Sequence, residues 1–141
     1  MIYRLNKLYK IEWYYFYIMN SITTIMPVSK IISFPKLHID VEYVIGKNAQ
    51  ENFEIIDDAE DHHIWFHVHG HSSSHVIAKL DDELNKKDLR YIIKQGAILC
   101  KQYSKLKSNK NVEIVYTTIE NITKTEIPGS VITENEKKIT I

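Results

Sequence analysis

Histidine is the residue type in this chain with the most evident chemical potential. Six of its seven histidines are clustered: His62, His63, His67, His69, His71 and His75. Neutral imidazole is a common metal ligand, and alternate residues of a strand point to the same side. His67 and His69, joined by His75 from a paired strand, therefore form a candidate three-histidine metal site with an open position.

Several features of the sequence weigh against that metal site. The single cysteine is far away in the chain, and no HExxH spacing occurs. Half-buried histidines bonded to serine hydroxyls or backbone carbonyls explain the cluster more simply, and we favour that explanation. A catalytic serine is also disfavoured, because Ser74 and His75 are strand neighbours that point to opposite faces. GxSxG, GxGxxG and P-loop patterns are absent, so we expect no enzyme and no cofactor.

Charge is segregated along the chain, although 18 basic and 18 acidic residues cancel to a net charge of zero. Residues 86–110 carry eight basic side chains and one acid, whereas residues 51–61 carry six acids and no base. At about 100° per residue, five of the cations share one narrow arc of a helix: Lys87, Arg90, Lys94, Lys101 and Lys105. Such a cationic ridge attracts phosphate by Coulomb force and counterion release, although solvated lysine faces are also common.

The elements that position these residues follow from hydrophobic periodicity. We expect strands over 38–45, 64–69, 75–80, 112–117 and 137–141, an extended segment over 31–34, and a short helix or bend over 49–59. The strands 64–69 and 75–80 form a hairpin, with Trp65, His67 and His69 on one face. A long amphipathic helix spans 86–107. Together these elements predict an α+β domain with a mixed or antiparallel sheet packed against one long helix.

Gly96 lies inside the apolar stripe of the long helix. A glycine there costs about 1 kcal/mol relative to alanine, so we expect it to permit close packing against the sheet. The composition is otherwise that of an ordinary globular domain, with 44% hydrophobic residues. The single cysteine, Cys100, excludes a disulfide framework and fits a reducing, cytoplasmic location.

The N-terminal stretch differs from the rest of the chain. Arg4, Lys7 and Lys10 precede an aromatic run over 13–19, which is too short for a membrane span and lacks a signal-peptide cleavage pattern. We interpret residues 1–30 as an extension and residues 31–141 as the domain. An interfacial helix, a protein or membrane adaptor, and an over-long start with translation beginning at Met19 or Met26 are the alternatives.

Several short motifs, taken in order, resemble one known family. Ile64-Trp65-Phe66-His67-Val68 is followed by Ser73-Ser74-His75-Val76. Gly46-Lys47-Asn48 and Asn52 precede this pair of motifs, and Tyr103-Ser104-Lys105, Val115-Tyr116-Thr117, Lys124 and Gly129 follow it. This pattern, from about residue 31 to 141, is similar to the NFACT-R domain, a family named for RNA binding. The family includes the closing domain of ribosome-associated quality-control factors and a domain at the front of a eukaryotic coiled-coil-domain protein.

This chain departs from the family pattern at three places. His63 stands where the family usually has an acid, His69 and His71 are not family positions, and Lys47 stands where arginine is frequent. Lysine cannot form the two-pronged hydrogen bonds of arginine. These differences bear on ligand contacts more than on the fold.

The resemblance implies a non-catalytic RNA-binding module that recognises tRNA or ribosomal RNA, with the ribosome as a further partner. If partly exposed, Trp65 and His67 could then stack on an unpaired base, although we favour a core position for Trp65. Ser73 and Ser74 could donate to a phosphate. A pairing of His67 with His75 that fixes the hairpin is an alternative. The complete candidate RNA site is Lys47, Trp65, His67, Ser73, Ser74, His75, Lys87, Arg90, Lys94, Lys101, Lys105 and Lys124. The oligomeric state is left open.

Overall fold

The fold is an antiparallel six-stranded sheet with helices on both faces. The computed structural model describes residues 14–15, 18, 26–81 and 84–141. The elements are β1 (Val28–Phe34), β2 (Ile39–Gly46), α2 (Ala49–Asp57), β3 (Ile64–Val68), β4 (His75–Lys79), α3 (Lys86–Gln102), β5 (Glu113–Thr118), β6 (Ile122–Lys124), β7 (Val131–Thr133) and β8 (Lys137–Thr140). The sheet order is β1-β2-β4-β3-β5-β8, and β6 and β7 form a separate two-stranded hairpin.

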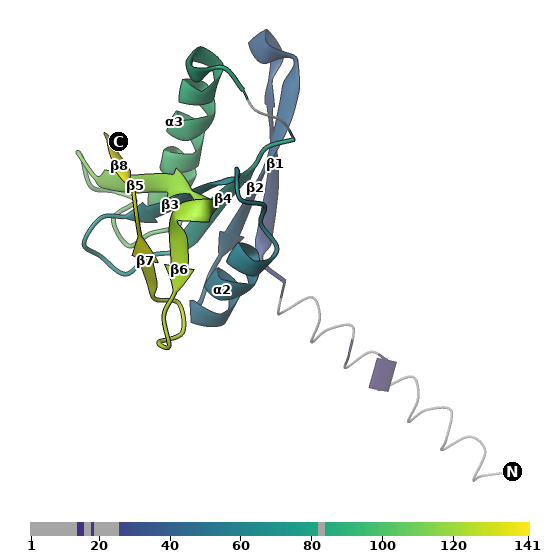
Figure 1. The fold of residues 1–141 in the computed structure, drawn as a ribbon, viewed down its shortest axis with the longest axis vertical. Coiled ribbons are helices and arrows are strands. Elements are labelled where there is room, and N and C mark those ends of the chain that lie inside the picture. The colour runs from purple at the N-terminus through teal and green to yellow at the C-terminus, as the bar shows by residue number, and fades with distance from the viewer. Residues whose placement is uncertain (1–13, 16–17, 19–25, 82–83) are drawn as a thin grey trace, which may run out of the picture.

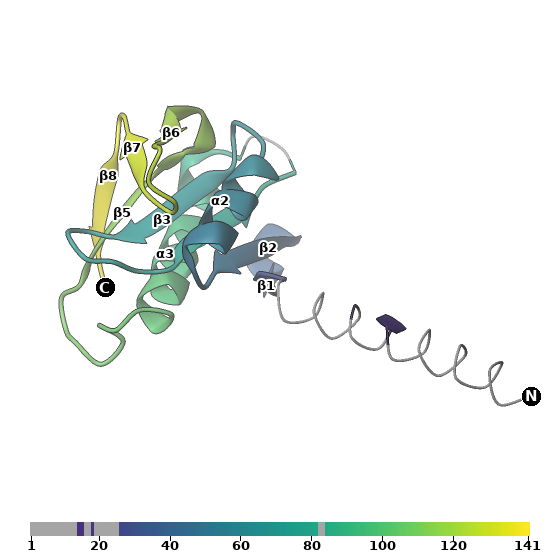
Figure 2. The same cartoon turned by 90° about the horizontal axis from the view of Figure 1, so that it is seen from below.

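The two helices lie on opposite sides of the sheet (Figures 1 and 2). Side chains alternate along β3, so that Ile64, Phe66 and Val68 join the core beneath α3. Trp65 faces the other way and packs in a second core with residues of α2 and of the β6–β7 hairpin. The alternation that we predicted for this strand is therefore confirmed.

Close approach of α3 to the sheet depends on Gly96. A Cβ atom at Gly96 would lie 2.3 Å from Cζ of Phe66, which is completely buried. The phenol of Tyr43 donates a hydrogen bond to the carbonyl of Ile92 (2.9 Å), which ties β2 to the same helix. The predicted role of Gly96 in close packing is confirmed.

The predicted α+β class and the antiparallel sheet are confirmed, while four details differ from the prediction. The short helix that was one alternative for 49–59 is present as α2, so the domain does not have one helix alone. The segment expected over 31–34 is part of the longer strand β1, and β6–β7 was not predicted. Helix α3 ends at Gln102 rather than at Lys107, because the hydroxyl of Ser104 donates to the carbonyl of Lys101 (2.7 Å) and turns the chain.

The predictions for the N-terminal stretch fall almost entirely outside the described residues. The interfacial helix, the adaptor and the alternative start sites all concern residues 1–25, of which the structure describes 14, 15 and 18. Across the described part of the chain, no helix combines the length and the apolar character that a membrane crossing requires.

Candidate nucleic-acid interface

A cluster of aromatic rings forms where β3 and β4 meet on the α2 side of the sheet. The indole N–H of Trp65 donates to Nδ1 of His75 (3.0 Å). The ring of His67 stacks parallel to that of Trp65, with centroids 5.6 Å apart, and meets the ring of His75 edge-on at 5.1 Å. Trp65 and His75 are each 2% exposed, whereas His67 is partly exposed.

Burial keeps both histidines of this cluster uncharged at neutral pH. Desolvation, with a smaller contribution from the nearby His67, lowers the pKa of His75 to about 3. Burial also lowers the pKa of His67 below its usual value. Because Nδ1 of His75 accepts the indole N–H, its own proton resides on Nε2. The histidines therefore contribute aromatic surface rather than positive charge.

Above this cluster lies a groove of about 390 Å³ formed by four segments that are distant in sequence. The turn from β2 to α2 supplies Lys47, Asn48, Ala49 and Asn52. The β3–β4 hairpin supplies His67 and Ser72 to Ser74, the end of α3 supplies Tyr103 to Lys105, and the β6–β7 turn supplies Pro128 and Gly129. Residues of most of the motifs that carry the family resemblance thus meet in one place, whereas Val115-Tyr116-Thr117 and Lys124 lie outside the groove.

The first wall of the groove is the beginning of α2, which the local sequence defines. The side chain of Asn48 caps the helix by accepting from the backbone N–H of Glu51 (2.9 Å). Gly46 is required because a Cβ there would lie 2.3 Å from Oδ1 of Asn52, the atom that accepts the backbone N–H of His75 (3.1 Å). Asn52 therefore joins α2 to the aromatic cluster.

The opposite side of the groove is held by two serines. The Ser73 hydroxyl accepts from the backbone N–H of Val68 (3.1 Å) and donates to the carbonyl of Ser74 (3.2 Å). The Ser74 hydroxyl donates to the carbonyl of Tyr103 (3.3 Å), which fastens the hairpin loop to the end of α3. Both serines line the groove. Their hydroxyl protons bind carbonyls within the domain, so the donation to phosphate, which stays a prediction, requires these bonds to be exchanged.

The groove is electropositive. Lys47 and Lys105 both line it, and no carboxylate is among its described lining residues. The ammonium of Lys30 lies 5.4 Å from the centre of the Tyr103 ring and adds a third positive charge at the border. Glu51 is 3% exposed and lies 3.9 Å from Nζ of Lys47, so one buried acid partly offsets this charge.

Except for Lys105, which lines the groove, the cationic ridge lies outside it. Lys87, Arg90 and Lys94 are exposed on α3, and among the described residues no carboxylate lies within 4 Å of them. Lys101 is partly buried, and its Nζ donates to the carbonyl of Ile141 (3.4 Å). The acidic residues of α2 therefore do not neutralise this ridge.

Two of the candidate RNA residues are buried. Trp65 is 2% exposed, so the core position that we favoured for it is confirmed, and His75 is equally buried and offers RNA no surface. Lys124 does not line the groove; its Nζ bonds to the carboxylate of Asp57 and lies 5.2 Å from the centre of the Phe53 ring. Of the aromatic residues that we predicted to contact RNA, only His67 reaches the groove.

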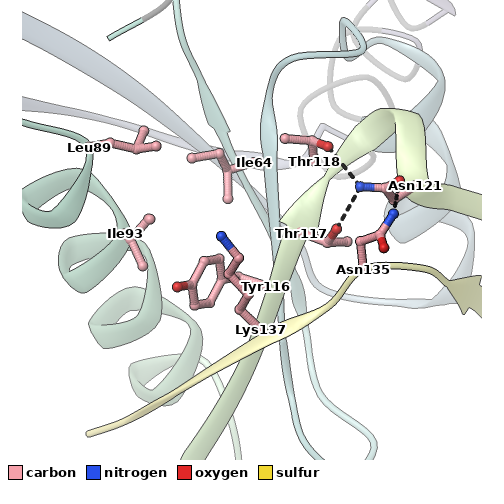
Figure 3. A pocket seen from close by; sticks show the side chains of 9 residues that line it. All are labelled: Ile64, Leu89, Ile93, Tyr116, Thr117, Thr118, Asn121, Asn135 and Lys137. Atoms are coloured by element: carbon pink, nitrogen blue, oxygen red, sulfur yellow. Dashed lines mark hydrogen bonds between the residues drawn. The ribbon is translucent and has the colours of Figure 1, made fainter. Parts of the chain in front are cut away.

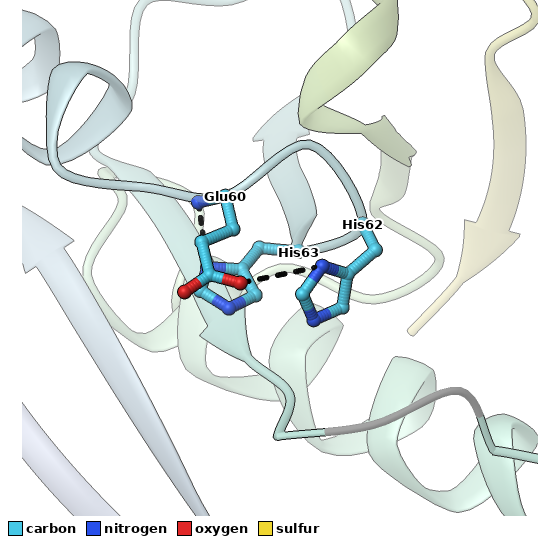
Figure 4. Close-up of side chains that lie close together, drawn as sticks. All are labelled: Glu60, His62 and His63. Atoms are coloured by element: carbon cyan, nitrogen blue, oxygen red, sulfur yellow. Dashed lines mark hydrogen bonds and ion pairs between the residues drawn. The ribbon is translucent and has the colours of Figure 1, made fainter.

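The alternative metal site is not formed, since among the described residues His67, His69 and His75 are not brought together as ligands. Nδ1 of His75 already accepts from Trp65, and Nε2 of His69 accepts from the ammonium of Lys138 (3.2 Å). Within the described residues, the one group with metal-ligand proximity is Glu60, His62 and His63 (Figure 4).

The chemistry of that second group does not favour a metal ion either. Nε2 of His62 donates to the carbonyl of Leu80 (2.7 Å), while Nδ1 of His63 accepts from the backbone N–H of Glu60 (3.1 Å). The proton of neutral His63 is therefore on Nε2, which leaves no free lone pair on that ring. Only Nδ1 of His62 and the Glu60 carboxylate remain, fewer ligands than a protein zinc site uses.

A family model supplies the identity of the domain. Residues 34–138 match the model of the NFACT protein RNA binding domain, which covers well over half of the chain. The chain therefore belongs to the NFACT RNA-binding domain family, and the predicted resemblance is confirmed. The search of curated proteins finds no match.

Solved structures provide a comparison of fold. One similar structure is the C-terminal part of the fibronectin/fibrinogen-binding protein from Streptococcus suis, with a TM-score of 0.68 and 19% sequence identity. The match covers 82% of this chain but 45% of that one. At this identity the similarity establishes a shared fold alone.

Sequence reasoning missed part of the groove. Asn48, Asn52, Tyr103 and Ser104 were recognised as motif residues but not proposed as site residues, although all four line the groove. The feature that could have identified all four was their place in the family's motifs. No motif marked Lys30, because its position depends on the pairing of β1 with β2.

Proposed function

We propose that this protein is a non-catalytic RNA-binding module whose principal contact with RNA is the groove between α2 and the end of α3. The observation that carries the proposal is the convergence of residues from most of the family's motifs on one hollow that is flanked by Lys47 and Lys105 and has no acid among its described lining residues. Membership of a family described as an RNA-binding domain supports the same partner.

The groove offers two kinds of contact that suit RNA. The ammonium groups of Lys47 and Lys105 attract phosphate, and the beginning of α2 adds the positive end of a helix dipole. The exposed part of the His67 ring, together with Tyr103, provides an aromatic surface for an unstacked base. Because His67 is uncharged at neutral pH, it favours stacking over ion pairing.

The cationic ridge has a secondary role in this proposal. Its exposed cations extend the positive surface along α3, where they attract the backbone without reading sequence. We propose tRNA or ribosomal RNA as the ligand, with the ribosome as the larger partner. The proposed location is the cytoplasm.

Salt-dependent binding of labelled tRNA, measured by fluorescence anisotropy, tests the proposal. Lys47→Gln with Lys105→Gln should lower the slope of log affinity against log salt by about 0.7 to 0.9 for each lost phosphate contact. A charge-matched control is Lys36→Gln with Lys124→Gln, since Lys36 is exposed at the turn after β1 and Lys124 is paired with Asp57. Binding that ignores salt, or equal behaviour of the two variants, contradicts the proposal.

A further inference from the structure

A second hollow lies beside the first half of α3 and involves no residue of the groove (Figure 3). It has a volume of about 240 Å³. Ile64 of β3 and the side chains of Leu89 and Ile93 on α3 form an aliphatic wall, as Figure 3 shows. Residues of β5 and β8, together with the turn before β8, complete the pocket. We refer to it as the helix pocket.

The helix pocket contains one aromatic ring and one positive charge. Tyr116 and Lys137 are register partners on the paired strands β5 and β8, and both line the pocket (Figure 3). No acid lines the pocket among the described residues, and none of their carboxylates lies within 4 Å of the Lys137 amine. An ammonium group with no neighbouring carboxylate attracts ligand atoms that carry a negative partial charge.

The polar end of the helix pocket is an organised amide network. The side-chain amide of Asn121 donates to the hydroxyls of Thr117 and Thr118 (both 3.0 Å). Its oxygen accepts from the amide of Asn135 (3.3 Å), which lies in the turn between β7 and β8 with φ of 50°. These bonds leave the oxygen and one N–H of the Asn135 carboxamide without a partner among the described residues.

This combination of groups matches the chemistry of a nucleobase. A base has a flat face that stacks on aromatic and aliphatic side chains, and an edge that presents donors and acceptors next to each other. The free carboxamide edge of Asn135 can pair with such an edge, and Lys137 can donate to a ring nitrogen or carbonyl. We propose that the helix pocket binds one unpaired nucleobase of the RNA, an inference that rests on the proposed function.

The position of the helix pocket allows the same RNA to reach both sites. The pocket borders α3 at Leu89, and the groove begins where α3 ends, about 20 Å away at 1.5 Å per residue. The bond from Lys101 to the carbonyl of Ile141 shows that the basic flank of α3 faces the end of β8, the strand that carries Lys137. A phosphate backbone that follows this flank therefore connects the two sites.

Titration of ¹⁵N-labelled protein with adenosine or uridine monophosphate, followed by NMR, tests the helix pocket. A mononucleotide is used because a long RNA would also bind the groove. We expect shifts in the side-chain amide signals of Asn121 and Asn135. Lys137→Gln should weaken the affinity by about tenfold, the effect of losing one hydrogen bond from a charged donor. Lys138→Gln is the matched control, because Lys138 is the next residue of β8 and lies beside Glu113.

A second pair of variants separates the carboxamide of Asn135 from its backbone. Asn135→Gly keeps the left-handed backbone and removes the carboxamide, so monophosphate binding should weaken. Asn111→Gly is its control, since Asn111 also has a positive φ of 56° and does not line the pocket. Circular dichroism verifies that each variant is folded.

The outcomes distinguish the helix pocket from the proposed function. Shifts confined to groove residues, no shifts at all, or shifts that survive both Lys137→Gln and Asn135→Gly overturn the helix pocket, while salt-dependent tRNA binding still supports the proposed function. Pocket shifts combined with a complete absence of tRNA binding overturn the proposed function and leave a nucleotide site.

Discussion

Helices α2 and α3 cover opposite faces of one sheet, and their charged residues have different partners. On α2, Glu51 accepts from the backbone N–H of Lys47 (2.8 Å), Glu54 accepts from Gln50, and Asp57 pairs with Lys124. On α3 the acid of the first turn accepts from the capping Asn85, whereas Lys87, Arg90 and Lys94 of the ridge are exposed to solvent. The acids of one helix therefore stabilise the domain, and the cations of the other remain accessible.

The comparison explains how a chain of zero net charge can present a surface suited to a polyanion. Net charge reports a sum, whereas an RNA backbone responds to the charges within about one Debye length, roughly 10 Å at 0.1 M salt. The C-terminal end of α3 and the N-terminal end of α2 both border the groove. The negative dipole end of α3 is offset by Lys101 and Lys105, while the positive dipole end of α2 favours phosphate.

The largest predicted effect concerns the close contact of Gly96 in α3 with Phe66 of the sheet. Gly96→Ala should lower the free energy of unfolding by about 2 to 3 kcal/mol, because the new methyl group overlaps the Phe66 ring. Urea denaturation followed by tryptophan fluorescence measures the change. Combining Gly96→Ala with Phe66→Leu should recover part of the loss. A Gly96→Ala variant more stable than the parent, as helix propensity alone predicts, would show that the contact is not tight.

The second prediction concerns the loss of folding stability at low pH, which depends on His75 on the α2 side of the sheet. Because the folded pKa of His75 is about 3, the unfolded chain binds a proton near pH 6.5 that the folded chain rejects. Stability contributed by His75 is therefore complete above pH 6.5 and decreases as the pH falls towards 3, with a loss of about 2 kcal/mol between pH 7 and 5. Urea denaturation at several pH values measures this slope.

The control for the acid prediction is His75→Asn, which retains an acceptor for the Trp65 indole but cannot titrate. Its stability should depend less on pH over the same interval, even if its absolute stability is lower. Equal slopes for the parent and His75→Asn would mean that His75 is protonated without cost in the folded state. The remaining slope belongs to other groups, including His67, whose pKa is also lowered by burial.

Features that depend on residues close together in the sequence were predicted correctly, whereas contacts between residues far apart in the sequence were not. Alternation in β3 and the stripe of α3 are local patterns, so the sheet faces and the contact at Gly96 were predicted correctly. A core position was favoured for Trp65, but its partners in α2 and in the β6–β7 hairpin were not predicted, because they are distant in sequence. The pairing of Lys124 with Asp57 was not predicted for the same reason, since the two residues are 67 positions apart.

The third prediction tests whether position or net charge controls RNA binding. Arg90→Glu with Lys94→Glu should weaken tRNA binding by about tenfold, because two accessible cations are reversed on α3. Lys36→Glu with Lys110→Glu changes the net charge equally at other exposed positions and should have a smaller effect. Anisotropy at fixed salt measures both variants. Equal losses would show that the ridge is an ordinary solvated surface.

The smallest predicted effect concerns the ion pair that belongs to α2. Lys124 and Asp57 are substantially exposed, so a double-mutant cycle of Lys124→Met and Asp57→Ala should give a coupling energy of about 0.2 to 1 kcal/mol. Lys124→Met retains the hydrocarbon stem over the Phe53 ring, which separates loss of charge from loss of packing. Because Lys124 lies outside the groove, its replacement should change tRNA affinity by less than about twofold. A larger loss would assign Lys124 to the RNA surface and would mean that the acids of α2 do not keep their lysine partners away from RNA.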